Sequence, residues 1–262
     1  MASNADKIIQ RYGDGTREEN RNSGDRADYI MEYKYTKLLL DKYVTKEHTV
    51  LEIGCGTGYY GMYLSELCKS YYGIDITHGN IDLFQKKIQN NKLVNVEATI
   101  GDATDLAIFQ DNSFDVVLNF GPMYHLPLNE RKLSFSETKR ICKKGGLLMF
   151  AYINKIGVYL GGCLQEPDKY PNKHKNKSIL VDGIDDSRDS IYWFTMPEEM
   201  EMIAKEFELT ILDNLGVDFI LIPDMYNLSS ENRGAWEELT DYLCTSISCT
   251  GFANHAVMVC AK

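Results

Sequence analysis

The chain has 262 residues, of which 44% are hydrophobic and 25% charged, values that exclude a disordered, collagen-like or low-complexity protein. Since domains have about 150 residues, this length favours one α/β domain with additions. Lys and Arg number 28 against 38 Asp and Glu, and the net charge of −10 argues against binding to a nucleic-acid backbone.

The hydrophobic residues give no sign of a membrane protein. No apolar run approaches the roughly 18 residues of a membrane-spanning helix, and the first residues, Met1 to Lys7, lack the apolar stretch of a signal peptide. We therefore expect a cytoplasmic protein without a membrane partner. The seven cysteines are scattered and form no CxxC pair, so neither a disulfide framework nor a metal site is indicated. The oligomeric state is not indicated.

The first 45 residues are polar and then helical, with the best helix at 29–43, and we expect them to form a cap or lid. From residue 46 onward, short β-branched or aliphatic runs alternate with segments of helical spacing, which is typical of βαβ units on a parallel sheet. The expected strands of this part are 49–53, 71–76, 94–100, 114–120 and 147–153.

The rest of the chain adds one helix, an insert and two strands. A helix is expected to begin with Asn129 as its N-cap and to end in Lys143 and Lys144 before Gly145. Residues 154–194 have little apolar periodicity and are predicted to be an inserted lid. Thr195 to Glu198 match a capping box that begins another helix. Strands at 209–217 and 255–261 bracket a mostly helical excursion at about 218–254.

The strongest chemical signal is a glycine-rich turn after the first strand. Gly54, Gly56 and Gly58 let the backbone turn sharply and let a ligand approach the peptide groups. A dinucleotide fingerprint, GxGxxG, would need a third glycine at position 59, where Tyr59 stands. Cofactors with a pyrophosphate are therefore disfavoured. The alternative is a tight turn that binds nothing.

Two aspartates follow the next two strands. Asp75 comes 17 residues after Gly58, and a carboxylate there can accept hydrogen bonds from both ribose hydroxyls. Asp102 follows the third strand and could accept a hydrogen bond from the exocyclic amine of adenine. Each alone could be an ordinary turn or cap residue. Together with the glycine turn, they indicate a nucleoside site.

The order Glu52-Ile53-Gly54-Cys55-Gly56-Thr57-Gly58, Asp75, Asp102 resembles the class I S-adenosylmethionine-dependent methyltransferases, over residues 45–155. Segments 12–21, 74–81 and 254–262, with Gly121-Pro122-Met123-Tyr124-His125-Leu126, resemble a bacterial subgroup with a GPLYHL-type motif. The resemblance implies a doubly wound, mostly parallel seven-stranded Rossmann-like sheet with an antiparallel last strand. S-adenosylmethionine is the implied cofactor, and residues 46–262 are the implied domain that binds it.

The resemblance also assigns roles to the residues at the strand ends. Residues 52–58 would hold the methionine end of the cofactor, Asp75 the ribose, Asp102 with its neighbour the adenine, and 119–121 the floor of the site. The implied cofactor-binding residues are Glu52, Gly54, Cys55, Gly56, Gly58, Asp75, Ile76, Asp102, Ala103, Asn119, Phe120 and Gly121. Amino-directed DNA methyltransferases carry Asp/Asn-Pro-Pro-aromatic where this chain has residues 119–122, so DNA is discounted as substrate.

Tyr124 and His125 are the catalytic candidates, because they should lie near the methyl group. His125 could accept the proton that the nucleophile loses, or it could merely pack under the loop and bond a backbone carbonyl. Tyr124 is more typical of a pocket wall. Methyl transfer from a sulfonium depends mostly on alignment and exclusion of water, so a lid is expected. The lid candidates are the segment around Tyr12, Arg17 and Arg21, and the insert, whose lysines at 169–177 could attract an acidic substrate or be solvated.

The expected function is transfer of a methyl group from S-adenosylmethionine to an O, N or S nucleophile of a small-molecule acceptor, with S-adenosylhomocysteine as product. A non-catalytic S-adenosylmethionine-binding protein is the main alternative. A nucleotide-dependent oxidoreductase is a weaker one, since Tyr59 breaks the dinucleotide fingerprint.

Overall fold

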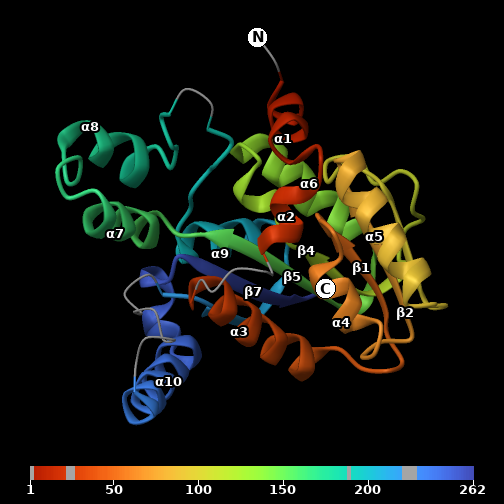
Figure 1. The fold of residues 1–262 in the computed structure, drawn as a ribbon. Coiled ribbons are helices and arrows are strands. Elements are labelled where there is room, and N and C mark those ends of the chain that lie inside the picture. The colour runs from red at the N-terminus through yellow and green to blue at the C-terminus, as the bar shows by residue number, and fades with distance from the viewer. Residues whose placement is uncertain (1–2, 22–26, 188–189, 220–228) are drawn as a thin grey trace.

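The computed structural model describes residues 3–21, 27–187, 190–219 and 229–262. These residues form a seven-stranded sheet with helices on both faces (Figure 1). The strands are β1 (Thr49–Ile53), β2 (Ser70–Asp75), β3 (Val96–Ile100), β4 (Phe114–Asn119), β5 (Cys142–Ile153), β6 (Thr210–Gly216) and β7 (His255–Ala261). Their order is β3-β2-β1-β4-β5-β7-β6, and β7 runs antiparallel to both neighbours. The expected doubly wound sheet is confirmed.

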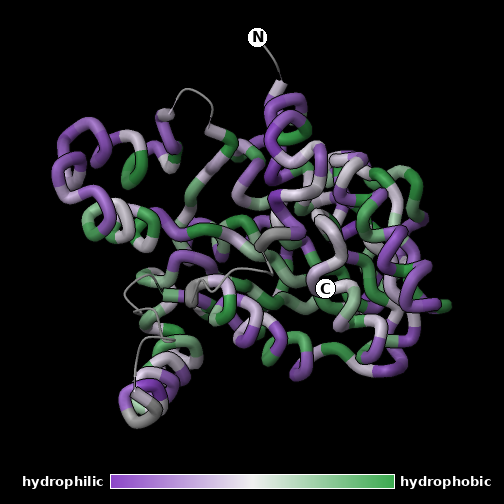
Figure 2. Tube along the Cα trace, in the orientation of Figure 1, coloured by the Kyte–Doolittle hydropathy of each residue, from purple (hydrophilic) through white to green (hydrophobic). Residues whose placement is uncertain are grey.

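The central strands are apolar on both sides, which explains why helices cover both faces. Successive side chains of a strand point to opposite faces. Val50 and Val116 pack in one hydrophobic cluster, and their neighbours Leu51 and Val117 pack in the other. All four are fully buried. A parallel sheet of this kind is stable only with both faces covered, and Figure 2 shows the hydrophobic residues concentrated on the central strands.

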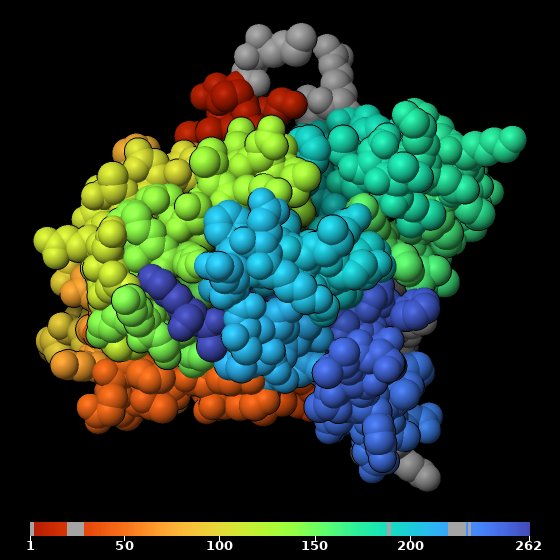
Figure 3. Space-filling model, turned by 180° about the vertical axis from the view of Figure 1, so that it is seen from behind, coloured from red at the N-terminus to blue at the C-terminus, as the bar shows by residue number. Residues whose placement is uncertain are grey.

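Two groups of helices complete these clusters. Helices α3 (Ala27–Tyr43), α4 (Tyr59–Leu64), α5 (His78–Asn90) and α10 (Ser230–Thr245) pack in the first cluster. Helices α6 (Leu128–Ile141) and α9 (Pro197–Glu206) pack in the second, where Phe135 stacks on Phe150 with ring centroids 3.9 Å apart. Figure 3 shows α9, in cyan, at the middle of the face seen from behind.

The remaining helices are short or lie outside these layers. They are α1 (Asn4–Tyr12), α2 (Thr16–Arg21), α7 (Lys155–Gln165), α8 (Lys173–Lys175), the 3₁₀ turns η1 (Pro122–Tyr124) and η4 (Ile247–Phe252), and the π-helical turn η2 (Asn176–Val181). Figure 1 shows α7 and α8 on the side of the sheet opposite α5. Within the described ranges, no helix combines the length and the apolar character needed to cross a membrane.

The predicted limits of α6 were wrong at both ends. The N-cap is Pro127, so Asn129 lies inside the first turn. Pro127 has φ −61° and ψ 161°, an extended conformation that proline favours just before a helix. The helix ends at Ile141, because Cys142 already pairs with Phe114 in the sheet. Lys143 and Lys144 therefore lie at the start of β5, which begins earlier than expected.

The insert is more helical than its weak periodicity suggested. Helix α7 is held by close tertiary packing: a Cβ atom at Gly157 would lie 2.1 Å from the carbonyl oxygen of Ala253. Tyr159, Ile179 and Phe194 form a small apolar cluster of their own with Ile153 of β5. Contacts of this kind leave no periodic pattern in the sequence.

Two smaller boundaries also differ. The N-cap of α9 is Met196 rather than Thr195, and Glu199 rather than Glu198 accepts a hydrogen bond from the Met196 N–H, at 3.0 Å. β3 begins at Val96, two residues later than expected, and leaves Val94 98% exposed. The predicted excursion at 218–254 contains α10, but its residues 220–228 lie outside the described ranges.

Candidate active site

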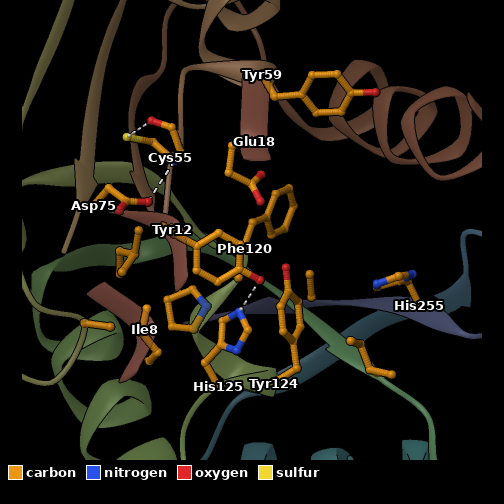
Figure 4. Close-up of a pocket in the computed structure, with 18 of the residues that line it drawn as sticks. Ile8, Tyr12, Glu18, Cys55, Tyr59, Asp75, Phe120, Tyr124, His125 and His255 are labelled. Carbon is orange, nitrogen blue, oxygen red and sulfur yellow. Dashed lines mark hydrogen bonds between the residues drawn. The ribbon is translucent and has the colours of Figure 1, made fainter. Parts of the chain in front are cut away.

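A cavity of about 690 Å³ opens at the edge of the sheet where the parallel strands end. Its walls come from the ends of β1 to β4, from β5 and β7, and from α1, α2 and α3. Figure 4 shows Ile8, Tyr12 and Glu18 of the N-terminal segment lying around the same space as Asp75 and Phe120. Ligands of open α/β sheets bind at this edge.

The three glycines after β1 all have positive φ, but they serve different purposes. A Cβ atom at Gly54 would lie 2.3 Å from the Phe120 carbonyl oxygen, and one at Gly58 would lie 2.2 Å from the Phe84 ring. At Gly56 the nearest atoms are those of the Glu18 side chain, at 3.7 Å across the cavity. Gly54 and Gly58 thus permit close packing, whereas Gly56 keeps the cavity open. Gly58 is not among the residues that line it.

Asp75, at the end of β2, holds the glycine turn in place and also faces the cavity. Its Oδ2 accepts a hydrogen bond from the Gly56 N–H at 3.0 Å. Its Oδ1 accepts bonds from the N–H and the hydroxyl of Thr77, at 2.8 and 2.5 Å, and from the Asn80 amide at 3.2 Å. The carboxylate is therefore fixed in position beside the neighbouring Ile76, which also lines the cavity.

Asp102 and Ala103 line the cavity after β3. The carboxylate of Asp102 accepts hydrogen bonds from the N–H and the hydroxyl of Thr104, both at 2.8 Å. This is an ordinary turn formed by an aspartate, and the same turn presents Asp102 to the cavity. The structural and the ligand-binding interpretations are therefore compatible.

Glu52 is a buried carboxyl in the cavity wall. It is 2% exposed and accepts a hydrogen bond of 2.6 Å from the Tyr71 hydroxyl. Burial raises the pKa of Glu52 to about 8, and the negative charge of Asp75 adds to this, while the bond from Tyr71 opposes it. Glu52 is therefore mainly protonated at pH 7. The pKa of the neighbouring Cys55 thiol is also raised by burial, so Cys55 stays a neutral thiol.

Asn119 does not line the cavity, in contrast to the prediction. Its side chain is fully buried and donates hydrogen bonds to the hydroxyls of Ser134, at 2.8 Å, and Thr138, at 3.0 Å, both on α6. Neighbouring side chains along an extended segment point in opposite directions. Phe120 and Gly121, the next two residues, do line the cavity.

His125 is buried beneath the N-terminal segment. Its Nδ1 lies 3.0 Å from the Ile191 carbonyl oxygen, which can only accept a hydrogen bond, so Nδ1 carries the proton of the neutral ring. Its Nε2 lies 3.5 Å from the Tyr12 hydroxyl, as the dashed line in Figure 4 shows. Burial lowers the pKa of His125 to about 4, and the charges of Arg11 and Arg17 contribute. The imidazole is therefore neutral at pH 7.

Contacts at both ends of the cavity attach the N-terminal segment. At one end, the Asn4 side chain donates a hydrogen bond of 2.5 Å to the His125 carbonyl oxygen. At the other end, Glu19 forms an ion pair of 2.5 Å with Lys87, whose ammonium also donates to the Thr57 carbonyl at 3.0 Å. Helices α1 and α2 therefore bridge from the η1 turn to the glycine turn.

The lysines of the insert do not reach the cavity. Three of them pair with acidic neighbours: Lys169 with Glu166, Lys175 with Asp186, and Lys177 with Asp182. Of the two interpretations of this cluster, the geometry favours solvated surface pairs over a site for an acidic substrate.

His255, which lines the cavity, and its buried partner Asp218 are residues that the sequence interpretation did not single out. His255 lines the cavity, with its ring centroid 6.1 Å from that of Tyr124 (Figure 4). Its Nδ1 lies 2.7 Å from Oδ2 of Asp218, which is 1% exposed. The available signal was topological. Because β7 is antiparallel, its first residue lies at the edge where β6 and the other parallel strands end.

The glycine turn, Asp75 and Asp102 all fall within the part of the chain that matches a known family. Residues 51–150 match the model of a methyltransferase domain. The chain is 24% identical over 183 residues to a ubiquinone biosynthesis O-methyltransferase from Bartonella tribocorum, covering 70% of this chain and 68% of the relative. The chain is an S-adenosylmethionine-dependent methyltransferase.

Solved structures share the fold of this methyltransferase at low sequence identity. The magnesium protoporphyrin IX methyltransferase of Synechocystis PCC 6803, with bound S-adenosylhomocysteine, has a TM-score of 0.62 at 13% identity and covers 97% of this chain and 98% of its own. The [4+2]-cyclase SpnF has a TM-score of 0.68 at 17% identity, over 100% and 97%. The cofactor of the present methyltransferase is S-adenosylmethionine. The space kept open at Gly56 beside Asp75 fits such a ligand.

Proposed function

We propose that this methyltransferase methylates an oxygen nucleophile of a small-molecule acceptor bound in the same cavity as the cofactor. The observation that carries the proposal is the continuity of the cavity. One side is formed by Gly56, Asp75 and Asp102, and the other is a mainly apolar wall from β5, β7 and α7. The name of the Bartonella tribocorum relative, ubiquinone biosynthesis O-methyltransferase, supports oxygen as the nucleophile.

When bound, S-adenosylmethionine supplies an electrophilic methyl group on a sulfonium. In our proposal, Glu52 and residues 54–57 hold its methionine end, and Asp75 accepts hydrogen bonds from its ribose. Asp102 and Ala103 contact the adenine, and Phe120 and Gly121 form the floor. Closure of the cavity around the bound molecules would exclude water and align the acceptor, which supplies most of the acceleration in such a reaction.

The finer assignments from the sequence remain proposals. We place residues 1–45 as a cap and 46–262 as the cofactor-binding domain. We also place the chain in the bacterial subgroup with the GPLYHL-type motif, on the segment Gly121 to Leu126. Its cytoplasmic location stays a prediction.

The function can be tested in two steps. Calorimetry should show binding of S-adenosylmethionine and S-adenosylhomocysteine. Mass spectrometry should then detect the mass gain of one methyl group on hydroxyl compounds, with matched thiols and amines as alternatives. Transfer to a thiol or amine but not to any hydroxyl compound would contradict oxygen as the nucleophile.

Binding of the cofactor should release a proton from Glu52. The raised pKa keeps Glu52 protonated at pH 7, and the cationic methionine end of the cofactor stabilises its ionised form. Affinity should therefore rise with pH between about 5 and 8 and level off above the pKa of the free protein. Calorimetry at pH 7 in two buffers of different ionisation enthalpy measures the release. The proton release should vanish in Glu52→Gln. If the binding enthalpy of the wild type were the same in both buffers, Glu52 would not be the group that loses a proton.

The N-terminal segment and the insert should become more protected from hydrogen exchange when S-adenosylhomocysteine binds. Polar contacts such as those of Asn4, Tyr12 and Glu19 attach α1 and α2 to the body of the protein, and segments held in this way open at low free-energy cost. Mass spectrometry should show slower exchange in 3–21 and 155–187 and no change in α6. Equal exchange with and without ligand would make both segments structural additions rather than lids.

A further inference from the structure

We propose that His255, positioned by Asp218, accepts the proton from the hydroxyl group of a mainly apolar phenolic acceptor. This inference rests on the proposed function and deepens it, because it names the base and the class of acceptor. His125, which the sequence favoured for this role, would instead belong to the closure of the N-terminal segment.

The Asp218–His255 pair has the geometry of a base with a fixed tautomer. Oδ2 of Asp218 lies 2.7 Å from Nδ1 of His255, and Oδ1 accepts the backbone N–H of the same residue at 2.5 Å. The Asn254 amide nitrogen is also near Nδ1, at 3.1 Å, but the carboxylate is the closer and the charged partner. A carboxylate at Nδ1 leaves Nε2 as the acceptor and stabilises the imidazolium that forms.

His125 lacks this arrangement. Its Nδ1 faces the neutral Ile191 carbonyl, and its Nε2 faces the phenol of Tyr12. Arg11 and Arg17 disfavour the imidazolium. An imidazole in these surroundings holds a transferred proton poorly. As a neutral ring, His125 can instead connect η1 with the insert and with α1.

The surroundings of His255 select the acceptor. The neighbouring cavity wall includes six apolar side chains from β5, the loop after β6, β7 and the insert: Ala151, Ile153, Val158, Phe194, Val217 and Val257. Such a wall favours a hydrocarbon or aromatic body without charge. Tyr124 lies between His255 and the rest of the site, as Figure 4 shows. The imidazole is a polar group on this wall that a hydroxyl of such a body can meet.

The step balances without any further reactant. Nε2 of His255 takes the hydroxyl proton as the acceptor oxygen bonds to the methyl carbon. The carbon–sulfur bond breaks, and its electron pair stays on the sulfur as a neutral thioether. The imidazolium, held by Asp218, returns its proton to solvent after the products leave.

The first test needs no turnover. The visible absorbance of 4-nitrophenol distinguishes phenol from phenolate, so it can be titrated into the S-adenosylhomocysteine complex below the pH at which the free probe ionises. Wild type and the surface control His174→Gln should increase the phenolate fraction, and His255→Gln should not. Asp218→Asn should lower the fraction, and Asp218→Glu should restore part of it. A wild type that fails to bind or ionise the probe would overturn the inference.

The second test compares methylation of 4-methylphenol with that of the more acidic 4-nitrophenol. Loss of a general base costs about 10²-fold or more in kcat, so His255→Gln should lose this much with 4-methylphenol, with little change in KM, and far less with 4-nitrophenol. If His125→Gln showed this selective loss instead, His125 would be the base. Calorimetry with S-adenosylhomocysteine distinguishes failure of the proposed function from failure of this inference. If the wild type does not bind S-adenosylhomocysteine, the proposed function is refuted. If it binds normally but His255→Gln shows no selective loss of kcat with 4-methylphenol, only this inference is refuted.

Discussion

Gly56→Val is expected to weaken S-adenosylhomocysteine binding at least 100-fold. Gly56 has φ +53°, and the space beside it is the cavity itself, bounded by Glu18 at 3.7 Å. A branched side chain would occupy the volume that the ligand needs. It would also strain the left-handed backbone by about 1–3 kcal/mol. Since each 1.4 kcal/mol is about a tenfold change in affinity, calorimetry should detect no binding.

Gly145→Val is the matched control for backbone strain. Gly145 has φ +75° and nothing within 4 Å of its added Cβ, and it lies on the surface at the start of β5. Its substitution should lower stability by a similar amount and leave affinity unchanged. Loss of binding in both variants would indicate a general loss of structure. Normal binding by Gly56→Val would refute the role of the glycine turn.

Asp75→Ala should weaken the same ligand by about 100-fold. The variant loses the acceptor that we assign to the ribose, and it also releases the Gly56 N–H and Thr77 from the carboxylate that positions them. Hydrogen bonds to a charged group are worth about 1.5–3 kcal/mol each, so one lost ligand bond and a loosened turn account for this effect.

Asp82→Ala removes a carboxylate from the exposed face of the neighbouring helix α5 and should bind normally. Asp75→Asn keeps one acceptor oxygen, so its affinity for the ligand should lie between those of Asp75→Ala and wild type. Thermal unfolding with and without ligand separates lost affinity from lost stability. Unchanged affinity in a folded Asp75→Ala protein would show that Asp75 does not hold the ribose.

The meeting of Gly56, Asp75 and Asp102 in one cavity could be predicted because it follows from strand order. Gly56, Asp75 and Asp102 each follow a strand, and parallel strands end at one edge of a sheet, so their meeting in one cavity needed no knowledge of side-chain packing. The short continuous apolar runs of the strands predicted which segments are buried on both faces.

The His255 side of the cavity depended on facts that a linear pattern does not contain. His255 and Asp218 are 37 residues apart in sequence and meet because β7 lies antiparallel beside β6. Asn119 was wrongly predicted to form the floor of the site, because the sequence does not show on which face of the β4 segment its side chain lies. Helix α7 escaped prediction because packing at Gly157, rather than an amphipathic pattern, holds it.

The attachment of the N-terminal segment at both ends of the cavity has a kinetic consequence. Asn4 is bonded at the η1 turn and Glu19 at Lys87 beside the glycine turn, with only residues 13–15 between the two helices. If this segment is the lid, one opening motion exposes both halves of the cavity, so the methylated product and the spent cofactor leave during the same event. Turnover would then be limited by a diffusive movement of chain, and kcat should fall as solvent viscosity rises.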